Sequence, residues 1–351
     1  MYYCIANPSA RSGNTEGALQ RLEGALGKNN IPYKSILTEG PGHARRILEE
    51  ITAPDFDRGR IKDAGDTKDA RDAKDAGDAK DAGDTVIVIG GDGTINEALS
   101  GIRDFSKVRF AILPAGSSND LARGLGLPED IDAIIDRIVE GNVRRVMDIG
   151  RLHYDHRSEA MSRLHSENIE RLGDTAVFGV SAGIGFDAAV CEEALTSPIK
   201  KRLNKLHLGK LSYGLIAMNQ LFRAGRPAIN IDYVDENDKE QSIHVETMYF
   251  AAIMNNPYEG GGYKFAPDAV NDDGLLTVCI IGEMSPLKTL VHFPAAQAGK
   301  HYPVKGVHHF HAKHLTARTA VPLWVHTDGE VAFKSDRITA DCLPQKLQLI
   351  V

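Results

Sequence analysis

The sequence predicts a two-domain α/β protein, with an N-terminal α/β domain on a parallel sheet followed by a mostly antiparallel β domain. Short apolar runs alternate with helical patterns up to about Gly141, and alternating β-branched segments between turn signals replace them afterwards. The length of 351 residues also exceeds the roughly 250 at which single cores stop growing. We therefore expect domains at 1–141 and 142–340, with a C-terminal segment, 341–351, that returns to the first domain.

In the first domain, each strand-like apolar run leads into a polar or glycine-rich loop. The expected strands are Tyr2–Ala6, Tyr33–Leu37, Thr85–Ile89 and Val108–Leu113, and helices begin near Thr15, Gly42, Thr94 and Ser118. Strands separated by helices imply right-handed crossovers and a parallel sheet. The loops after such strands share one edge of the sheet, and ligands bind at that edge.

The second domain shows the alternation that is typical of antiparallel strands with one buried face. The expected strands are Val143–Ile149, Ala176–Ser181, Ala228–Val234, Ser242–Met254, Leu275–Ile281, Val307–Thr319 and Pro322–Phe333. A helical stretch from Pro198 to Phe222 interrupts them. The polar segment His153–Gly173 is expected to be an insertion or a surface helix.

Residues 62–85 repeat a six-residue unit, KDAGDT and its variants, with no apolar side chain larger than alanine. A period of six matches neither the helix nor the strand, so the segment has no face to bury in exchange for its ordering entropy. We expect a solvated insertion. It holds eight Asp against five Lys and Arg, and so carries −3 of the net charge of −7.

Composition excludes several classes of protein. The acidic balance argues against a protein that coats nucleic acid, because that function needs clustered Lys and Arg. The 4 cysteines are far apart and form no C-x-x-C pair, which disfavours a disulfide framework or a cysteine zinc site. The N-terminus lacks the features of a secretory signal, and no apolar run approaches the roughly 18 residues of a membrane span. We expect a cytoplasmic protein, soluble or peripheral to a membrane.

The strongest chemical motif follows the third expected strand and reads Gly90-Gly91-Asp92-Gly93-Thr94-Ile95-Asn96-Glu97. Glycines between a strand and a helix let the backbone approach a phosphate chain, and the helix start supplies N–H donors. Thr94 and Glu97 have the spacing of a capping box. An aspartate among phosphates makes sense if a divalent cation lies between them, so the motif predicts a Mg-nucleotide. An ordinary strand-to-helix turn, which needs one glycine, is the alternative.

A second strand-to-helix junction reads Pro114-Ala-Gly116-Ser117-Ser118-Asn119-Asp120. Taken singly it has the composition of an ordinary N-cap, but two such junctions at one sheet edge favour a ligand site. Gly183-Ile-Gly185-Phe-Asp-Ala188 superficially fits a dinucleotide fingerprint, but it lacks the βαβ unit that follows such motifs. A tight approach of the backbone is the better interpretation there.

Taken together, these motifs resemble the diacylglycerol kinase catalytic domain family, which includes bacterial lipid kinases and the sphingosine and ceramide kinases. The matching segments are G-G-D-G-T-I-N-E-A at 90–98, P-A-G-S-S-N-D-L-A-R at 114–123, S-A-G-I-G-F-D-A at 181–188, G-G-G-Y-K-F-A-P-D-A-V-N-D-D-G-L-L at 260–276 and D-G-E at 328–330. The resemblance implies ATP and Mg²⁺ as cofactors and transfer of the γ-phosphoryl group to a lipid hydroxyl, most simply that of diacylglycerol. By resemblance the nucleotide would contact Asn7, Pro8, Ser9, Ser12, Gly13, Thr38, Gly90, Gly91, Asp92, Gly93, Thr94, Asn96, Glu97, Ser117, Asn119 and Asp120.

The resemblance also raises Asp328 and Glu330 to catalytic candidates beside Asp92, one of the pair accepting the proton of the lipid hydroxyl. It implies a structural Mg²⁺ site formed by Asp273 and the backbone carbonyls of Val270 and Leu275. From the residues by themselves, Asp-Gly between apolar strands is a hairpin signal, and both the 272–274 and 328–330 segments are read as turns.

Several questions stay open at the level of sequence. Another lipid acceptor such as phosphatidylglycerol or a sphingoid base, an NAD kinase, and a non-catalytic nucleotide-binding regulator are the alternatives to a diacylglycerol kinase. The segment 198–226 is basic and contains no acidic residue, so it is either a core helix with solvated lysines or a surface that contacts membranes. We expect a lipid partner and no nucleic acid, and whether the protein forms a homodimer is open.

Overall fold

The computed structural model describes residues 1–10, 15–56, 83–161, 173–196, 209–223 and 225–350. The chain divides into two compact units: unit 1 comprises Met1–Met147 and Gln345–Val351, and unit 2 comprises Asp148–Pro344. The expected fold class is confirmed, because parallel strands build the sheet of unit 1 and antiparallel pairs build that of unit 2. The 62–85 repeat lies outside the described residues except for its last three, of which Asp84 and Thr85 belong to a strand rather than to an insertion.

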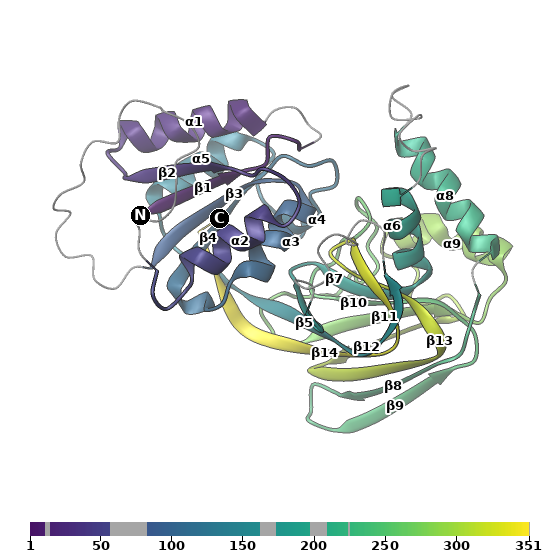
Figure 1. Cartoon of the computed structure of the whole chain (residues 1–351). Coiled ribbons are helices and arrows are strands. Elements are labelled where there is room, and N and C mark those ends of the chain that lie inside the picture. The colour runs from purple at the N-terminus through teal and green to yellow at the C-terminus, as the bar shows by residue number, and fades with distance from the viewer. Residues whose placement is uncertain (11–14, 57–82, 162–172, 197–208, 224, 351) are drawn as a thin grey trace. The chain divides into compact units, whose positions relative to one another are not determined.

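The sheet of unit 1 has the strand order β4-β3-β1-β2, all parallel (Figure 1). Its strands are β1 (Tyr2–Ala6), β2 (Tyr33–Leu37), β3 (Asp84–Gly90) and β4 (Val108–Pro114). The last residues of β14 (Glu330–Leu349) lie parallel to β4, with Gln348 opposite Arg109. The apolar C-terminus thereby completes this sheet.

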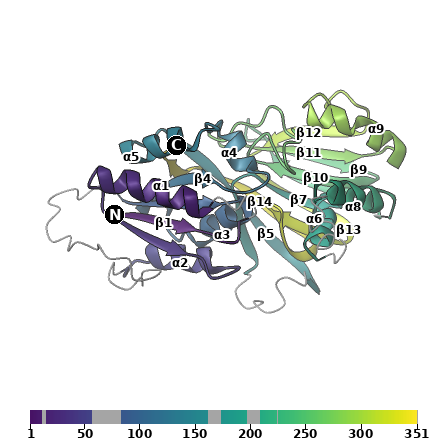
Figure 2. The same cartoon turned by 90° about the horizontal axis from the view of Figure 1, so that it is seen from above.

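Helices cover both faces of that sheet (Figures 1 and 2). α1 (Thr15–Lys28) and α5 (Ile131–Glu140) cover one face, and α2 (His43–Ile51) and α3 (Asp92–Gly101) cover the other. A short α4 (Asp120–Gly124) follows β4, and a 3₁₀ turn spans Phe105–Lys107. α1 buries Leu19, Leu22 and Leu26, whose spacing of three and four residues places them on one side of the helix.

Unit 2 is built from antiparallel strands, and in its described residues three helices accompany them. The strands are β5 (Arg145–Met161), β6 (Thr175–Phe178), β7 (Ser181–Gly185), β8 (Ile229–Val234), β9 (Glu240–Val245), β10 (Met248–Met254), β11 (Leu276–Gly282), β12 (Val307–Ala312), β13 (His314–Thr327) and β14; the helices are α6 (Phe186–Thr196), α8 (Gly209–Arg223) and α9 (Pro286–Gln297). Residues of β10 alternate between two cores: Ala251 and Ile253 join one, and Phe250 and Ala252 join the other. Both faces of this strand are therefore buried, which explains its uninterrupted apolar sequence.

Two expected strands divide where the chain changes partners, and a third, Pro322–Phe333, contains the turn that joins β13 (ending at Thr327) to β14 (beginning at Glu330). Ser242–Met254 divides into β9 and β10, and Val307–Thr319 divides into β12 and β13. In both places the chain changes partners: β9 pairs with β8 whereas β10 pairs with β7 and β11, and β12 pairs with β11 whereas β13 pairs with β8, β14 and β7. Apolar alternation continues across each break, so the sequence contains no sign of it.

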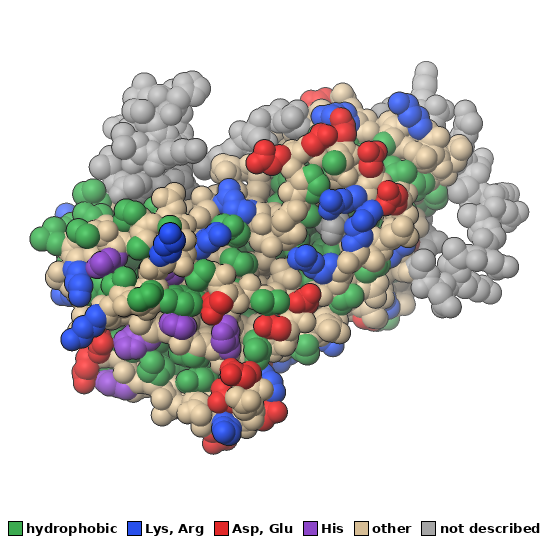
Figure 3. Space-filling view, turned by 180° about the vertical axis from the view of Figure 1, so that it is seen from behind, with side chains coloured by type: hydrophobic (Ala, Val, Ile, Leu, Met, Phe, Trp, Pro, Cys, Tyr) green, Lys and Arg blue, Asp and Glu red, His purple; other side chains and the backbone are tan. Residues whose placement is uncertain are grey.

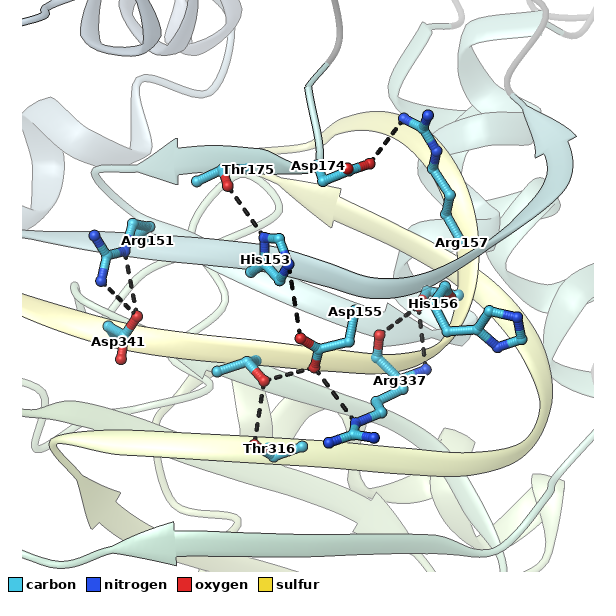
Figure 4. A network of polar contacts seen from close by, with 12 residues as sticks. Arg151, His153, Asp155, His156, Arg157, Asp174, Thr175, Thr316, Arg337 and Asp341 are labelled. Carbon is cyan, nitrogen blue, oxygen red and sulfur yellow. Dashed lines mark hydrogen bonds and ion pairs between the residues drawn. The ribbon is translucent and has the colours of Figure 1, made fainter.

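The surface helix expected as one alternative for His153–Gly173 is wrong for its first part, because β5 runs to Met161; the insertion stays a prediction, and residues 162–172 lie outside the described residues. The polar side chains of β5 are satisfied by neighbouring strands (Figure 4). Arg151 pairs with Asp341, His153 contacts Thr175, and His156 contacts Asp336. Leu152 and Tyr154, which alternate with these polar residues along β5, are buried in the core. The sequence of β5 therefore reads as a polar segment, because the residues that pair with its outward side chains lie in other parts of the chain.

None of the helices within the described part of the chain has the length and hydropathy that crossing a membrane requires.

Candidate functional site

The four parallel strands of unit 1 end at one edge, and the expected loops follow there (Figure 1). The ladder continues just beyond the strands: the N–H of Asn7 donates to the carbonyl of Ile89 (3.0 Å), and that of Thr38 donates to Ala6 (2.9 Å). The N–H of Ala115 donates to Gly90 (2.8 Å). These bonds place the loops that carry Asn7, Thr38 and the two glycine junctions side by side.

The two glycine junctions pack directly against each other. A Cβ atom on Gly116 would lie 2.5 Å from the Cα of Gly91, and one on Gly91 would lie 3.1 Å from the Cα of Gly116. A side chain at Gly116 would force the backbone apart, and one at Gly91 would make a contact tighter than most real Cβ contacts. At these two junctions the edge presents bare backbone, which is the surface that phosphate groups need for close approach to N–H donors.

The expected capping box at Thr94 and Glu97 is wrong. α3 begins two residues earlier than expected, at Asp92, with Gly91 as its N-cap and no side-chain cap. The Thr94 hydroxyl instead accepts from the Asn7 Nδ2 (2.8 Å), and the Glu97 carboxylate accepts from the Gly42 N–H (2.8 Å). Burial raises the pKa of Glu97, although the N–H groups of the 42–44 segment oppose that rise. Both side chains therefore join α3 to neighbouring loops, and so help to position the edge.

The acidic residues of the edge differ in their surroundings. Asp92, in the first turn of α3, has its Oδ1 atom 3.4 Å from the Leu121 N–H. Asp120 is buried, 6 % exposed, and forms an ion pair of 3.0 Å with Arg123. Asn119 adopts a left-handed conformation (φ 51°) and bonds to Gly116 through both its oxygen and its nitrogen. Asp120 is thus partly neutralised by Arg123.

The other expected nucleotide residues have these positions. The Asn7 Oδ1 accepts from the N–H of Ser9 (2.9 Å) and shapes the first loop. Thr38 and Asn96 are buried, and Ser117 is exposed. Ser12 and Gly13 lie outside the described residues.

In unit 2 the 328–330 motif forms the turn between β13 and β14. Asp328 (φ 50°) and Gly329 (φ 82°) both have positive φ, as a two-residue hairpin turn of this type requires. The Asp328 carboxylate accepts three backbone N–H bonds, from Gly179 (2.9 Å), Val180 (2.8 Å) and Ser181 (2.9 Å). Three donors stabilise the ionised carboxylate and occupy its lone pairs, so this side chain anchors the turn. Glu330 is the first residue of β14 and directly follows this turn.

The residues around the expected structural magnesium site fit a divalent cation. Asp273 and Asp148 lie near each other, and Asp148 has no exposed surface. The Gly274 N–H donates to the Asp148 carboxylate (2.7 Å), and the Leu275 N–H donates to that of Asp273 (3.0 Å). Burial raises the pKa of Asp273, and the neighbouring carboxylate of Asp148 raises it further. A bound cation would relieve this repulsion, and carboxylate and carbonyl oxygens are suitable ligands for Mg²⁺.

Comparisons with known proteins identify the family of the chain. A model of the diacylglycerol kinase catalytic domain matches residues 1–152, and one of the YegS C-terminal NAD kinase beta sandwich-like domain matches residues 180–351. A diacylglycerol kinase of Mycobacterium tuberculosis is 31% identical over 249 residues, which are 70% of each chain. The chain belongs to the diacylglycerol kinase catalytic domain family. Membership of this family identifies it as a kinase.

Two further relatives span nearly the whole chain. A Bacillus subtilis protein named "Putative lipid kinase YtlR" is 27% identical over 334 residues, 94% of this chain and 93% of its own. The crystal structure of a diacylglycerol kinase from Bacillus anthracis superposes with a TM-score of 0.60 at 18% identity, over 99% of this chain and 96% of that one. At that identity the superposition shows the fold.

Sequence reasoning missed four acidic or histidine residues that the fold gathers. Asp148 joins the loop of Asp273, and Asp187, Glu259 and His326 meet in unit 2 with ligand atoms within 4.8 Å of one another. Asp187 lay in a motif that was interpreted only as a tight backbone approach. That approach is confirmed at Gly183, where a Cβ atom would lie 2.1 Å from the Asp187 carboxylate. Glu259 and His326 carry no recognisable spacing, since 66 residues of chain separate them.

Proposed function

We propose that the protein is an ATP-dependent lipid kinase that transfers the γ-phosphoryl group of ATP to the hydroxyl of diacylglycerol, giving phosphatidic acid. The observation that carries this proposal is the close contact between Gly91 and Gly116, which leaves no Cβ atom between the two junction loops where phosphates would bind. The family and the printed names of the relatives support a lipid acceptor.

In this proposal the residues of unit 1 bind and orient the nucleotide. The backbone N–H groups at the start of α3 donate to the phosphate oxygens, and Thr94 and Asn7 hold the first loop against that helix. Asp92 would hold the Mg²⁺ that accompanies ATP, and the ion would neutralise phosphate charge. Orientation and charge neutralisation supply most of the acceleration in phosphoryl transfer.

In unit 2, Glu330 is the proton acceptor. The lipid hydroxyl oxygen forms a bond to the γ-phosphorus, the bond from that phosphorus to the β,γ-bridging oxygen breaks, and ADP leaves. The hydroxyl proton passes to the Glu330 carboxylate. Asp328 is less suited to this role because three N–H donors occupy and stabilise its ionised form.

The test is a transfer assay with γ-labelled ATP and a panel of acceptors: diacylglycerol, phosphatidylglycerol, sphingosine and NAD. We expect label in phosphatidic acid, dependence on Mg²⁺, and loss of transfer in Asp92→Asn with the folded structure retained by circular dichroism. Full activity of Asp92→Asn would remove the proposed role of that residue. Transfer to NAD and to none of the lipids would overturn the lipid kinase.

We further propose that the protein contacts membranes peripherally through α8. Much of the basic segment 198–226 lies outside the described residues, including Lys200, Lys201 and Arg202. Within its described part, Met218 (46%) and Phe222 (55%) are exposed one helical turn apart. An exposed apolar pair on a basic helix is suited to an anionic bilayer surface.

Two observations limit which parts of the protein can form the proposed membrane contact. Arg226 does not contribute to it, because its guanidinium bonds to the Met284 carbonyl (3.1 Å) and covers the ring of Tyr249. On the face shown in Figure 3, Lys and Arg side chains are interspersed with Asp and Glu among the described residues, so that face does not have the single-sign charge that favours anionic lipid.

Vesicle sedimentation tests the contact. Phe222→Asp should reduce binding to phosphatidylglycerol vesicles, whereas Val321→Asp, which changes an equally exposed apolar residue on β13 (48%), should not. Equal binding of both variants and of the unaltered protein would refute the role of α8. Transfer to a detergent-dispersed lipid would still report on the kinase itself.

A further inference from the structure

His326 of β13 is a buried ionisable side chain that the chemistry above does not use. It has no exposed surface, and its Nε2 lies 3.0 Å from the Glu259 Oε1 and 3.2 Å from the Asp187 Oδ2. Those two carboxylates are themselves only 12% and 13% exposed. Carboxylates this close in an interior of low dielectric repel each other unless a cation lies between them. The imidazole is the group placed to supply that charge.

Three separate elements bring the cluster together. Asp187 is in the first turn of α6, and Glu259 precedes three glycines that turn the chain so that it bridges back to Tyr263. His326 lies opposite Gly183 in the ladder between β13 and β7. A Cβ atom on Gly183 would lie 2.4 Å from the His326 Nε2, so glycine is required for the imidazole to reach the carboxylates. The arrangement is built into the fold on several sides.

The contacts determine the protonation of His326. Burial by itself would lower the pKa of His326, but Glu259 and Asp187 outweigh burial and raise it well above the ordinary value. The Gly329 N–H points to Nδ1 at 3.2 Å and favours the neutral form. One neutral contact is weaker than two charge-assisted bonds, so the imidazolium prevails. Nε2 carries a hydrogen in both forms, which makes it a donor to the carboxylates and not a metal ligand.

The cluster formed by Asp187, Glu259 and His326 lies next to the β13–β14 turn, which contains Asp328 and precedes Glu330. Thr327, next to His326, pairs with Glu330 across the hairpin. Burial raises the pKa of the Cys191 thiol to about 12, and this thiol lies within electrostatic reach of His326, Asp187, Glu259 and Glu330. The ionisable groups around His326 from α6 and the 259–263 loop are therefore two carboxylates and one neutral thiol, and that thiol also interacts with Glu330 of β14. A change in the charge of the imidazole would be felt at Glu330.

We propose that His326 is a positioning residue for phosphoryl transfer: its Nε2–H holds Asp187 and Glu259 together, and its positive charge balances them beside Glu330. The inference rests on the proposed function, in which Glu330 accepts the proton. Without the cation, the excess negative charge would raise the pKa of Glu330 and move the acidic limb of the rate profile to higher pH.

The experiment compares the kcat–pH profile of four full-length proteins: unaltered, His326→Gln, His326→Gln/Glu259→Gln, and His314→Gln. We expect His326→Gln to lower kcat by about tenfold or more at neutral pH, with the KM for ATP unchanged and the acidic limb moved to higher pH. The double variant removes one charge of each sign, so its profile should return toward that of the unaltered protein. His314→Gln should leave the profile unchanged. His314 is on β13, as His326 is, but it is partly exposed and pairs with Asp341 of β14.

An unchanged profile for His326→Gln would overturn the proposal. So would a double variant no better than the single one, because a merely structural histidine would not be rescued by removing a negative charge.

A second measurement does not depend on activity. In the resting protein, the imidazole nitrogens of ¹⁵N-histidine should report a second proton, on His326 Nδ1, that persists well above neutral pH, and Glu259→Gln should lower the pH at which His326 titrates. Titration near the ordinary value, unaffected by Glu259→Gln, would refute the cluster as described even if His326→Gln fails to fold. If no acceptor is phosphorylated, the proposed function fails while this titration still decides how His326 is held.

Discussion

The edge of unit 1 where we propose that phosphates bind and the β13–β14 turn of unit 2 are shaped in opposite ways. At the edge, Gly91 and Gly116 leave bare backbone because no side chain fits between them. At the turn, Asp328 provides a carboxylate that three backbone N–H groups hold in place, and Glu330 follows it. The first region needs residues without a Cβ atom, whereas the second needs one carboxylate and its hydrogen bonds. Substitutions at each should therefore fail differently.

The largest expected effect is on catalysis at Glu330. Glu330→Gln removes the proposed proton acceptor and should lower kcat by about 10²–10⁴-fold with the melting temperature nearly unchanged. Steady-state kinetics together with thermal denaturation measures both. If Glu330→Gln retained most of its kcat, Glu330 would not be the proton acceptor.

Asp328→Ala should instead destabilise unit 2. Three backbone donors lose a charged acceptor, which should cost about 3 kcal/mol of the free energy of unfolding, measured by chemical denaturation. Asp238→Ala is the matched control, since Asp238 also has positive φ (61°) but lies in an exposed turn between β8 and β9. Equal losses in the two variants would mean that backbone conformation, and not the three bonds, sets the cost.

Gly116→Ala should act on nucleotide binding. Its Cβ would lie 2.5 Å from the Cα of Gly91, so the two loops must separate, and the KM for ATP should rise about tenfold or more, equivalent to roughly 1.4 kcal/mol. Gly24→Ala in α1 is the control, because nothing lies within 4 Å of its Cβ position. Tight ATP binding by Gly116→Ala would show that the glycine contact does not shape the nucleotide site.

The smallest effect is expected at the polar network of β5 and β14 (Figure 4). Burial by itself would raise the pKa of Asp341, but bonds from His314 and Arg151 outweigh it and lower that pKa. Because the folded-state pKa lies below the unfolded one of about 3.9, the stability that Asp341 contributes is present above that pH and lost as pH falls through the folded value. Asp341→Asn should cost below about 1 kcal/mol at neutral pH and nothing at low pH. A constant difference across the range would contradict this linkage.

Much of unit 1 could be predicted because its signals are local. Each strand was a short apolar run, each loop followed it, and parallel pairing then placed the loops at one edge. The capping box failed because Thr94 and Glu97 found long-range partners in Asn7 and Gly42. Local spacing is a reliable guide where the residues satisfy each other, and a poor one where the fold offers better partners.

In unit 2 the polar partners were the difficulty. β5 continued through a polar segment because residues of β14 and β6 satisfy its outward side chains. The sequence did not show that Glu259 and His326 lie together, because the distance of 3.0 Å between Glu259 Oε1 and His326 Nε2 depends on a three-glycine turn and on the pairing of distant strands.

The sequence by itself determined the α/β order, the glycine loops and the membership of a kinase family, because these depend on residues close together in the chain. Only the tertiary structure decided which carboxylates are anchored, as Asp328 is, and which meet a buried imidazole, as Asp187 and Glu259 do. The physical reason is that the chemistry of an ionisable group is set by its burial and by the charges and donors around it. In this protein those neighbours come from distant parts of the chain.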